Sequence, residues 1–212
     1  MSDLDTFTLL PLEIDPQTKA VNTSSTSKTL QAELAALNTL HRSLLGVETP
    51  KNIPPPPIPV NPKRSANVAK LRDSANAEHR KGRYPEAIKL YTLGLQMALS
   101  RPLWEPQGLV REEAASVYAN RAQSHMAMLN WPEGAADAEA SVEAKKVGNA
   151  KAWWRRGKSL MEMGRLHEAR DWVQKALELE GPESELSALL RDIEARLEKA
   201  GRVGPDGASV VA

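Results

Sequence analysis

The sequence contains no cysteine, which excludes disulfide frameworks, thiolate zinc sites and cysteine nucleophiles. Aromatic residues are few, with five tryptophans, three tyrosines and one phenylalanine in 212 residues. The core must therefore consist mostly of Leu, Ala and Val, which favours helices packed closely through small residues. The chain also lacks an excess of charge, because 28 basic residues balance 27 acidic ones. This balance argues against a broad surface for nucleic acid or a membrane.

Long apolar runs are missing as well, since no stretch approaches the roughly 18 apolar residues that a membrane-spanning helix needs. The first five residues include two acids, where a secretory signal would carry bases. We therefore expect no direct membrane insertion. The four histidines have no metal-like spacing, and neither a phosphate-binding glycine loop nor a nucleophile–base set is visible. We expect no metal, no cofactor, no nucleic-acid partner and no enzymatic activity.

Proline divides the chain, because seven of its 15 prolines lie in residues 50–62. Such a run cannot be helical and favours a semi-rigid polyproline II spacer of about 3 Å per residue. A ligand for an aromatic-lined groove is the less favoured alternative. The predicted organisation is a small N-terminal partner-docking module (1–49), a Pro-rich linker (50–66), a helical domain with a C-terminal capping helix (67–201) and a flexible tail (202–212).

The N-terminal module is predicted to contain a hairpin and one helix. Residues 7–14 alternate imperfectly in hydrophobicity, and Asp15-Pro16-Gln17-Thr18 has turn chemistry. Leucines then recur on one side of a helix that ends at Gly46. These elements bury too little surface to be securely stable alone, so we expect their apolar side chains to dock on a partner. The candidate docking residues are Phe7, Leu9, Leu12, Ile14, Leu34 and Leu37.

After the linker, one short motif occurs three times. Residues 82–88 match residues 129–135 and 164–170, at steps of 47 and 35 residues. Both steps become 34 when an insert of about residues 102–114 and one extra residue near Gly148 are removed. Each motif lies between two helical stretches in which large and small residues alternate, as stacked antiparallel helix pairs require. A last amphipathic segment, residues 184–200, is predicted to cap the array.

This 34-residue pattern resembles the tetratricopeptide repeat, over roughly residues 68–183. The resemblance implies an all-α array of three repeats plus a capping helix, to which the chain adds the small N-terminal α+β module. Gly134 stands where the family usually has Ala, and Leu129 replaces a turn glycine. These departures weaken the second repeat most without breaking its period.

Five polar residues fall on the first helices of the three repeats. Arg72 and Asn76 are four apart in the first repeat, Asn120 lies in the second, and Lys151 and Arg155 are four apart in the third. The first helices form the concave wall of such an array, so these side chains could converge on one groove. Three cations and two amide donors suit a carboxylate ligand, because charge-assisted hydrogen bonds are about twice as strong as neutral ones.

The same five residues match, one by one, the dicarboxylate clamp of chaperone-binding tetratricopeptide domains. Arg72 differs, because the family more often has Lys there. The resemblance implies binding of the C-terminal tail of a cytosolic Hsp70-class chaperone, ending Glu-Glu-Val-Asp. Any single exposed Arg or Lys is usually just a solvated residue, so the hypothesis rests on the complete set.

The order of an N-terminal motif Leu-Leu-Pro-Leu-Glu-Ile-Asp-Pro (9–16), a Pro-rich linker and one clamp domain is similar to the tetratricopeptide subunit of the fungal endoplasmic-reticulum Sec complex for post-translational translocation. This resemblance implies that residues 1–60 bind a membrane-anchored Sec subunit. The chain would then lie peripherally on the cytosolic face of the endoplasmic reticulum. The alternative is a free cytosolic co-chaperone or assembly scaffold whose N-terminal segment folds back on its own repeats.

Overall fold

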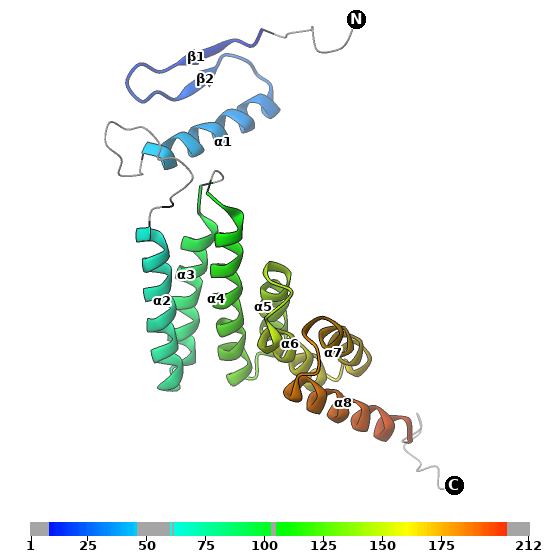
Figure 1. The fold of residues 1–212 in the computed structure, drawn as a ribbon. Coiled ribbons are helices and arrows are strands. Elements are labelled where there is room, and N and C mark those ends of the chain that lie inside the picture. Colours follow the sequence, from blue (N-terminus) through cyan, green and yellow to red (C-terminus); the bar gives the residue numbers. More distant parts are fainter. Residues whose placement is uncertain (1–8, 46–59, 61, 103–104, 203–212) are drawn as a thin grey trace, which may run out of the picture. The chain divides into compact units, whose positions relative to one another are not determined.

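The computed structural model describes residues 9–45, 60, 62–102 and 105–202. The chain forms two compact units, Met1–Val60 and Asn61–Ala212. Most of the expected linker, Phe7 and residues 203–212 of the expected tail lie outside the described residues. The elements are β1 (Leu12–Ile14), β2 (Val21–Thr23), α1 (Lys28–Leu45), α2 (Pro62–Arg80), α3 (Tyr84–Leu99), α4 (Gln107–Ala127), α5 (Trp131–Ala144), α6 (Ala150–Glu162), α7 (Leu166–Glu180) and α8 (Ser184–Arg202) (Figure 1). The predicted fold class is confirmed.

The N-terminal unit contains the expected hairpin and helix. Strands β1 and β2 are antiparallel, with Ile14 opposite Val21. The Asp15 carboxylate closes the turn by accepting hydrogen bonds from the backbone N–H groups of the residues two and three positions later, both at 2.8 Å. Asn38 of α1 binds the backbone of Val21 twice, accepting from its N–H and donating to its C=O, each at 2.8 Å. The helix is thereby hydrogen-bonded to β2.

In the C-terminal unit, the recurring motif forms the turn inside each helix pair. Gly82 and Gly164 adopt the left-handed region at a φ of 76°, which glycine reaches without strain. Leu129 takes the same place in the second repeat at a φ of 60°, a costly conformation for a residue with a Cβ. Proline lies in the first turn of the second helix in the first two repeats, where its missing N–H removes no helical hydrogen bond.

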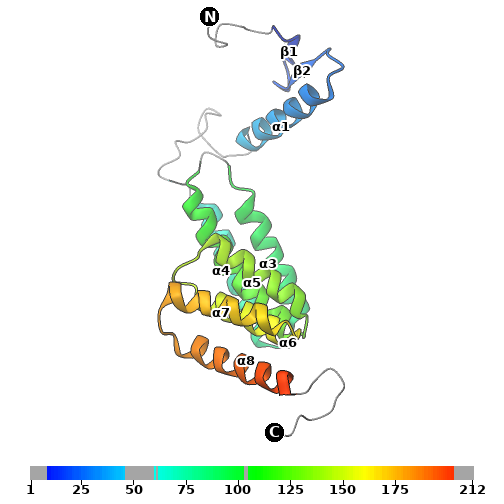
Figure 2. The same cartoon turned by 90° about the vertical axis from the view of Figure 1, so that its right-hand side faces the viewer.

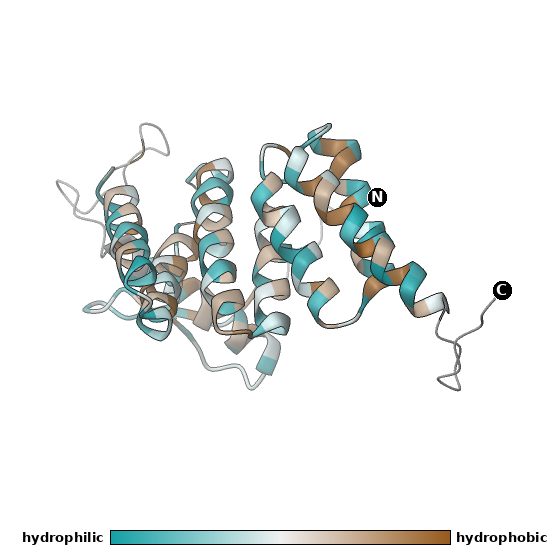
Figure 3. Ribbon diagram, turned by 90° about the horizontal axis from the view of Figure 1, so that it is seen from below, coloured by the Kyte–Doolittle hydropathy of each residue, from teal (hydrophilic) through white to brown (hydrophobic). Residues whose placement is uncertain are grey.

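The helices stack as three antiparallel pairs followed by α8. The first helices, α2, α4 and α6, contact one another in sequence, and α6 also contacts α8. Figure 2 shows α7 and α8 side by side, and Figure 3 shows that most helices combine hydrophilic and hydrophobic residues. Leu186 and Ile193 of α8 are fully buried against the third repeat. The predicted capping helix is thus present and shields the end of the core.

The segment expected as an insert is only partly a connection. Its second half is helical and extends α4, which begins at Gln107 after Pro106 and runs for 21 residues. The reason is local, because residues 107–114 are mostly helix formers and a proline precedes the first turn.

A buried cation fixes this connection. The Arg101 side chain is completely inaccessible, and its guanidinium donates to Glu105 at 2.6 Å and to both oxygens of Glu113 at 2.7 and 3.0 Å. It also donates to Ser65 Oγ of α2 at 2.8 Å. The charge is therefore satisfied on every side, and the connection is attached to the first repeat.

Candidate peptide-binding site

Two amide side chains meet between the first and second repeats. Asn120 Nδ2 of α4 donates to Asn76 Oδ1 of α2 at 3.1 Å. The hydroxyl of Tyr91, from α3, donates to the same oxygen at 2.5 Å. Both lone pairs of that oxygen are thereby used, which fixes the orientation of the amide. Within the described residues Asn76 Nδ2 has no partner, so it is a pre-oriented donor for a ligand.

The hydroxyl that holds Asn76 is surrounded by cations. Tyr91 is 1% exposed, and this burial raises its pKa. Three positive charges act in the opposite direction, those of Arg155, Arg80 and Arg72. Arg72 and Arg155, from different repeats, therefore lie within electrostatic range of the same asparagine pair. That all five clamp residues converge on one groove stays a prediction of the sequence.

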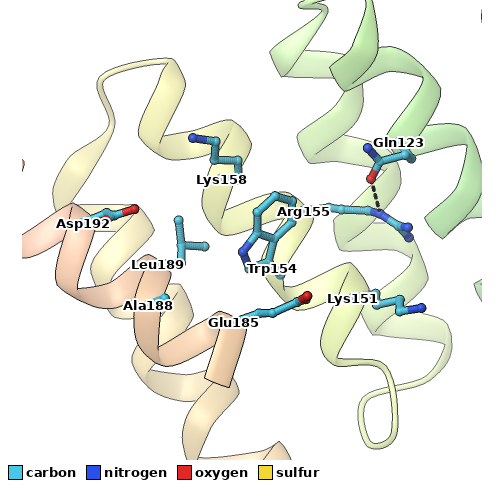
Figure 4. A pocket seen from close by; sticks show the side chains of 9 residues that line it. All are labelled: Gln123, Lys151, Trp154, Arg155, Lys158, Glu185, Ala188, Leu189 and Asp192. Carbon is cyan, nitrogen blue, oxygen red and sulfur yellow. Dashed lines mark hydrogen bonds between the residues drawn. The ribbon is translucent and has the colours of Figure 1, made fainter. Parts of the chain in front are cut away.

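Arg155 is the most unusual of these cations. Its Nε donates to Gln123 Oε1 at 2.9 Å, as Figure 4 shows. Burial lowers the pKa of Arg155, while Tyr91 and Glu185 act to raise it. No carboxylate lies within 4 Å of its guanidinium in the part of the chain that the structure describes. A desolvated guanidinium stays charged and is costly without an anion, so this site favours a ligand carboxylate.

Arg155 shares a cavity of about 440 Å³ with Lys151. The cavity lies between α6 and α8, with Gln123 of α4 on the opposite side of Arg155 (Figure 4). The complete lining is Gln123, Lys151, Trp154, Arg155, Lys158, Glu185, Ala188, Leu189 and Asp192. Two of the five predicted clamp residues are therefore neighbours on one wall, and the asparagines form a second pair.

Arg72 and Arg121 show how the remaining charges are used. Arg72 is one turn before Asn76, and its Nε and Nη2 donate to Asp73 Oδ1 at 3.2 and 3.1 Å. This contact is partly exposed, so water screens it and a ligand could replace it. Arg121 follows Asn120 directly but is bidentate to Asp137 at 2.7 and 2.6 Å. Its charge is compensated within the repeat.

The sequence pattern did not identify three contributors to the site. Tyr91 belongs to the second helix of the first repeat and not to the predicted set, although it orients Asn76. Gln123 lies three residues after Asn120 and shares its helix face, a spacing that could have revealed it. Glu185 carries no such signal, because the packing of α8 alone brings it to the cavity.

The described residues offer neither a metal site nor a membrane-spanning helix. None of their His, Asp and Glu side chains form a group of three suited to a metal ion. No helix among them is long and apolar enough to cross a membrane.

In the N-terminal unit, most of the predicted docking residues are exposed. The exposed fractions are 97% for Leu9, 66% for Ile14 and 46% for both Leu12 and Leu37. Leu34 is the exception at 7%, since it faces the interior of the unit. Leu34 is therefore a core residue and not available for docking.

Three stacked helix pairs with a polar groove define a tetratricopeptide-repeat protein, and the tetratricopeptide repeat family model matches residues 150–181. The chain belongs to the family of the ER protein translocation subcomplex subunit sec67 of Schizosaccharomyces pombe. The two are 39% identical over 157 residues, which cover 72% of this chain and 81% of the relative. The predicted similarity to the fungal Sec subunit is confirmed.

Solved structures show the same fold. A chain in the cryo-EM structure of the Sec complex from S. cerevisiae matches with a TM-score of 0.67 at 21% identity, covering 89% of this chain and 98% of that chain. The second domain of human RPAP3, bound to the HSP70 peptide SGPTIEEVD, has a TM-score of 0.52 at 23% identity, covering 62% and 98%. The first domain of Spaghetti (RPAP3), bound to the HSP90 peptide SRMEEVD, has a TM-score of 0.54 at 25% identity, covering 66% and 98%.

Proposed function

We propose that the chain is a non-enzymatic adaptor of the Sec translocation complex that binds the C-terminal tails of cytosolic Hsp70-class chaperones. One observation supports this proposal above the others. Arg155 is a partly buried cation without a carboxylate partner among the described residues, and it lies in one cavity with Lys151. A C-terminal aspartate brings two carboxylates within a few ångströms of each other, which suits such a cation pair. The proposed binding residues are Arg72, Asn76, Asn120, Lys151 and Arg155.

The asparagines make this site selective for a chain terminus. Asn76 Nδ2 offers a neutral donor whose orientation is set by Tyr91, so it adds a hydrogen bond without another charge to desolvate. The RPAP3 domains of similar fold hold peptides that end in EEVD, one from HSP70 and one from HSP90. Our proposal selects the Hsp70 class as the partner, and titrations with both peptides test this choice.

We further propose that residues 1–60 bind a membrane-anchored Sec subunit and hold the chain at the cytosolic face of the endoplasmic reticulum. The exposed leucines and Ile14 of the N-terminal unit support this proposal, since docking would bury them. The test is co-purification of the full-length chain with identified Sec subunits. Ile14→Asp should reduce recovery, whereas Asn22→Asp, an equal charge change on the paired strand, should not. Equal recovery of both variants would contradict this assignment.

The clamp is tested by titrating the full-length chain with SGPTIEEVD and with its C-terminal amide. Hydrogen bonds to charged groups contribute about 1.5–3 kcal/mol, so amidation and Arg155→Met should each weaken binding by about 10- to 150-fold. Arg111→Met provides the matched control, because Arg111 is exposed on α4 and does not line the cavity. The proposal is wrong if the amide binds as tightly as the acid, or if Arg155→Met retains full affinity.

A further inference from the structure

The cavity beside Arg155 adjoins a second one at the N-terminal ends of α6 and α8. The second cavity has a volume of about 550 Å³ and shares Lys151, Trp154 and Glu185 with the first. Its other lining residues are Gly148, Asn149, Ala150, Glu180, Glu183, Ser184 and Leu186. The two cavities thus form one groove between α6 and α8, and we call it the α6–α8 groove.

Charge changes sign across this groove. The α6 wall carries Lys151 and Arg155, whereas α8 contributes Glu185 and Asp192. In Figure 4 the Glu185 carboxylate points into the space between the two helices, near Trp154. The negative charge of Glu185 weakens the attraction of Lys151 and Arg155 for an acidic tail. The proposed carboxylate site therefore gives no reason for an acid at this position.

The other nearby acids have structural roles or lie farther along the groove. Glu180 accepts hydrogen bonds from the backbone N–H groups of Gly148 and Asn149, at 2.9 and 2.7 Å, and holds the turn that precedes α6. Glu185 is exposed and has no ion-pair partner within 4 Å in the described part of the chain. The negative charge of Glu185 acts to raise the pKa of Arg155, against the larger lowering effect of burial. Glu185 lines both cavities, whereas Glu183 lines only the second and Asp192 only the first, so Glu185 is the acid at the centre of the groove.

We propose that Glu185 determines which residue a bound tail can place just before its acidic terminus, favouring a basic or uncharged residue and rejecting an acid. This inference rests on the proposed function. A tail whose terminal carboxylates reach Lys151 and Arg155 and whose preceding residues follow the α6–α8 groove passes Glu185, because Glu185 lines both cavities of that groove.

The walls of the groove support this selection. A basic side chain would gain an ion pair with Glu185 and could stack on the indole of Trp154. An apolar side chain would contact Trp154 and Leu189 without loss. An acid would be repelled by Glu185 at a site that already holds the carboxylates of the tail, and such repulsion is a common source of specificity.

The test uses the full-length chain and three peptides: SGPTIEEVD, and the same peptide with its Ile replaced by Lys (SGPTKEEVD) or by Glu (SGPTEEEVD). The wild-type chain should bind the Lys peptide about fivefold more tightly than the Glu peptide, since exposed charge pairs contribute modestly. Glu185→Gln should reduce this ratio to below about twofold. Glu194→Gln, the same change at an exposed position of α8 outside both cavities, should preserve it.

The outcomes separate this inference from the proposed function. If Glu185→Gln strengthens all three peptides equally, Glu185 is only an internal counter-ion of Arg155 and the inference is wrong. If the wild-type chain shows no preference among the three peptides but still discriminates against an amidated terminus, the inference alone fails. If amidation has no effect, the proposed function itself fails.

Discussion

The hydrogen bond from Tyr91 to Asn76 provides a sharp test of how the site is built. Tyr91→Phe removes only the hydroxyl, whose oxygen lies 2.5 Å from Asn76 Oδ1 in a buried environment. Asn120 would remain as the single donor to that oxygen, so the amide would lose its fixed orientation. A typical net hydrogen bond contributes about 1 kcal/mol, so we expect a comparable loss in the free energy of unfolding.

The same change should also weaken peptide binding, because the ligand would have to reorient the Asn76 amide. A loss of about 1 kcal/mol corresponds to about fivefold in the dissociation constant of SGPTIEEVD, measured by calorimetry. Tyr118→Phe is the matched control, since its ring contacts the Arg121 guanidinium and its hydroxyl has no hydrogen bond to Asn76. If Tyr91→Phe lowers stability yet leaves affinity within experimental error of the wild type, Asn76 is not a ligand donor and the reasoning is refuted.

The remaining predictions concern packing, buried charge and pH. In Gly157→Ala the new Cβ would lie 2.5 Å from a methyl group of a buried valine, so overpacking should outweigh the helix-propensity gain and lower the urea-derived unfolding free energy by about 1 kcal/mol. In Gly94→Ala the nearest atom is 3.6 Å away, and stability should rise by up to about 1 kcal/mol; the opposite order of the two variants would contradict the packing argument. Arg101→Met should lower the unfolding free energy by about 3 kcal/mol in the same assay, because two carboxylates lose their buried counter-ion. A loss smaller than that of an exposed ion pair would refute the stabilising role of Arg101. Burial lowers the pKa of His79 and His125 below 6.5, so the unfolded state binds more protons than the folded state. The unfolding free energy should therefore decrease as the pH is lowered from 7.5 to 5.5. Replacing both histidines with Gln should flatten this pH dependence.

Periodic features of the fold could be predicted from the sequence because each repeat has the same local physics. The turn at Gly82 recurs at Gly164 with the same φ, and in both repeats the following helix begins two residues later, at Tyr84 and Leu166. The extension of α4 was not predicted, because removing residues to restore a period says nothing about their conformation. The burial of Arg101 was not predicted either, since a sequence does not show which charged residue will find partners on three segments.

The candidate site likewise has residues that the sequence predicts and residues that it does not. The Asn76–Asn120 contact and the neighbouring Lys151 and Arg155 could be predicted, because equivalent positions of the first helices lie close together when repeats stack. Glu185 belongs to α8, outside the repeats, so no period predicts its place. Leu34 shows the converse limit, because hydrophobicity alone cannot separate a core leucine from a docking one.

The site depends on the stacking of the repeats more than on any one helix. Asn76, Asn120 and Arg155 belong to α2, α4 and α6, and these first helices contact one another both directly and through the intervening α3 and α5. A shift of 1 Å between neighbouring repeats would break the 3.1 Å bond between the asparagines while leaving every helix intact. Peptide affinity should therefore decline before helical content does when stacking is weakened. Gly157→Ala should therefore also weaken peptide binding, since the new Cβ would press on side chains of α7 and α8.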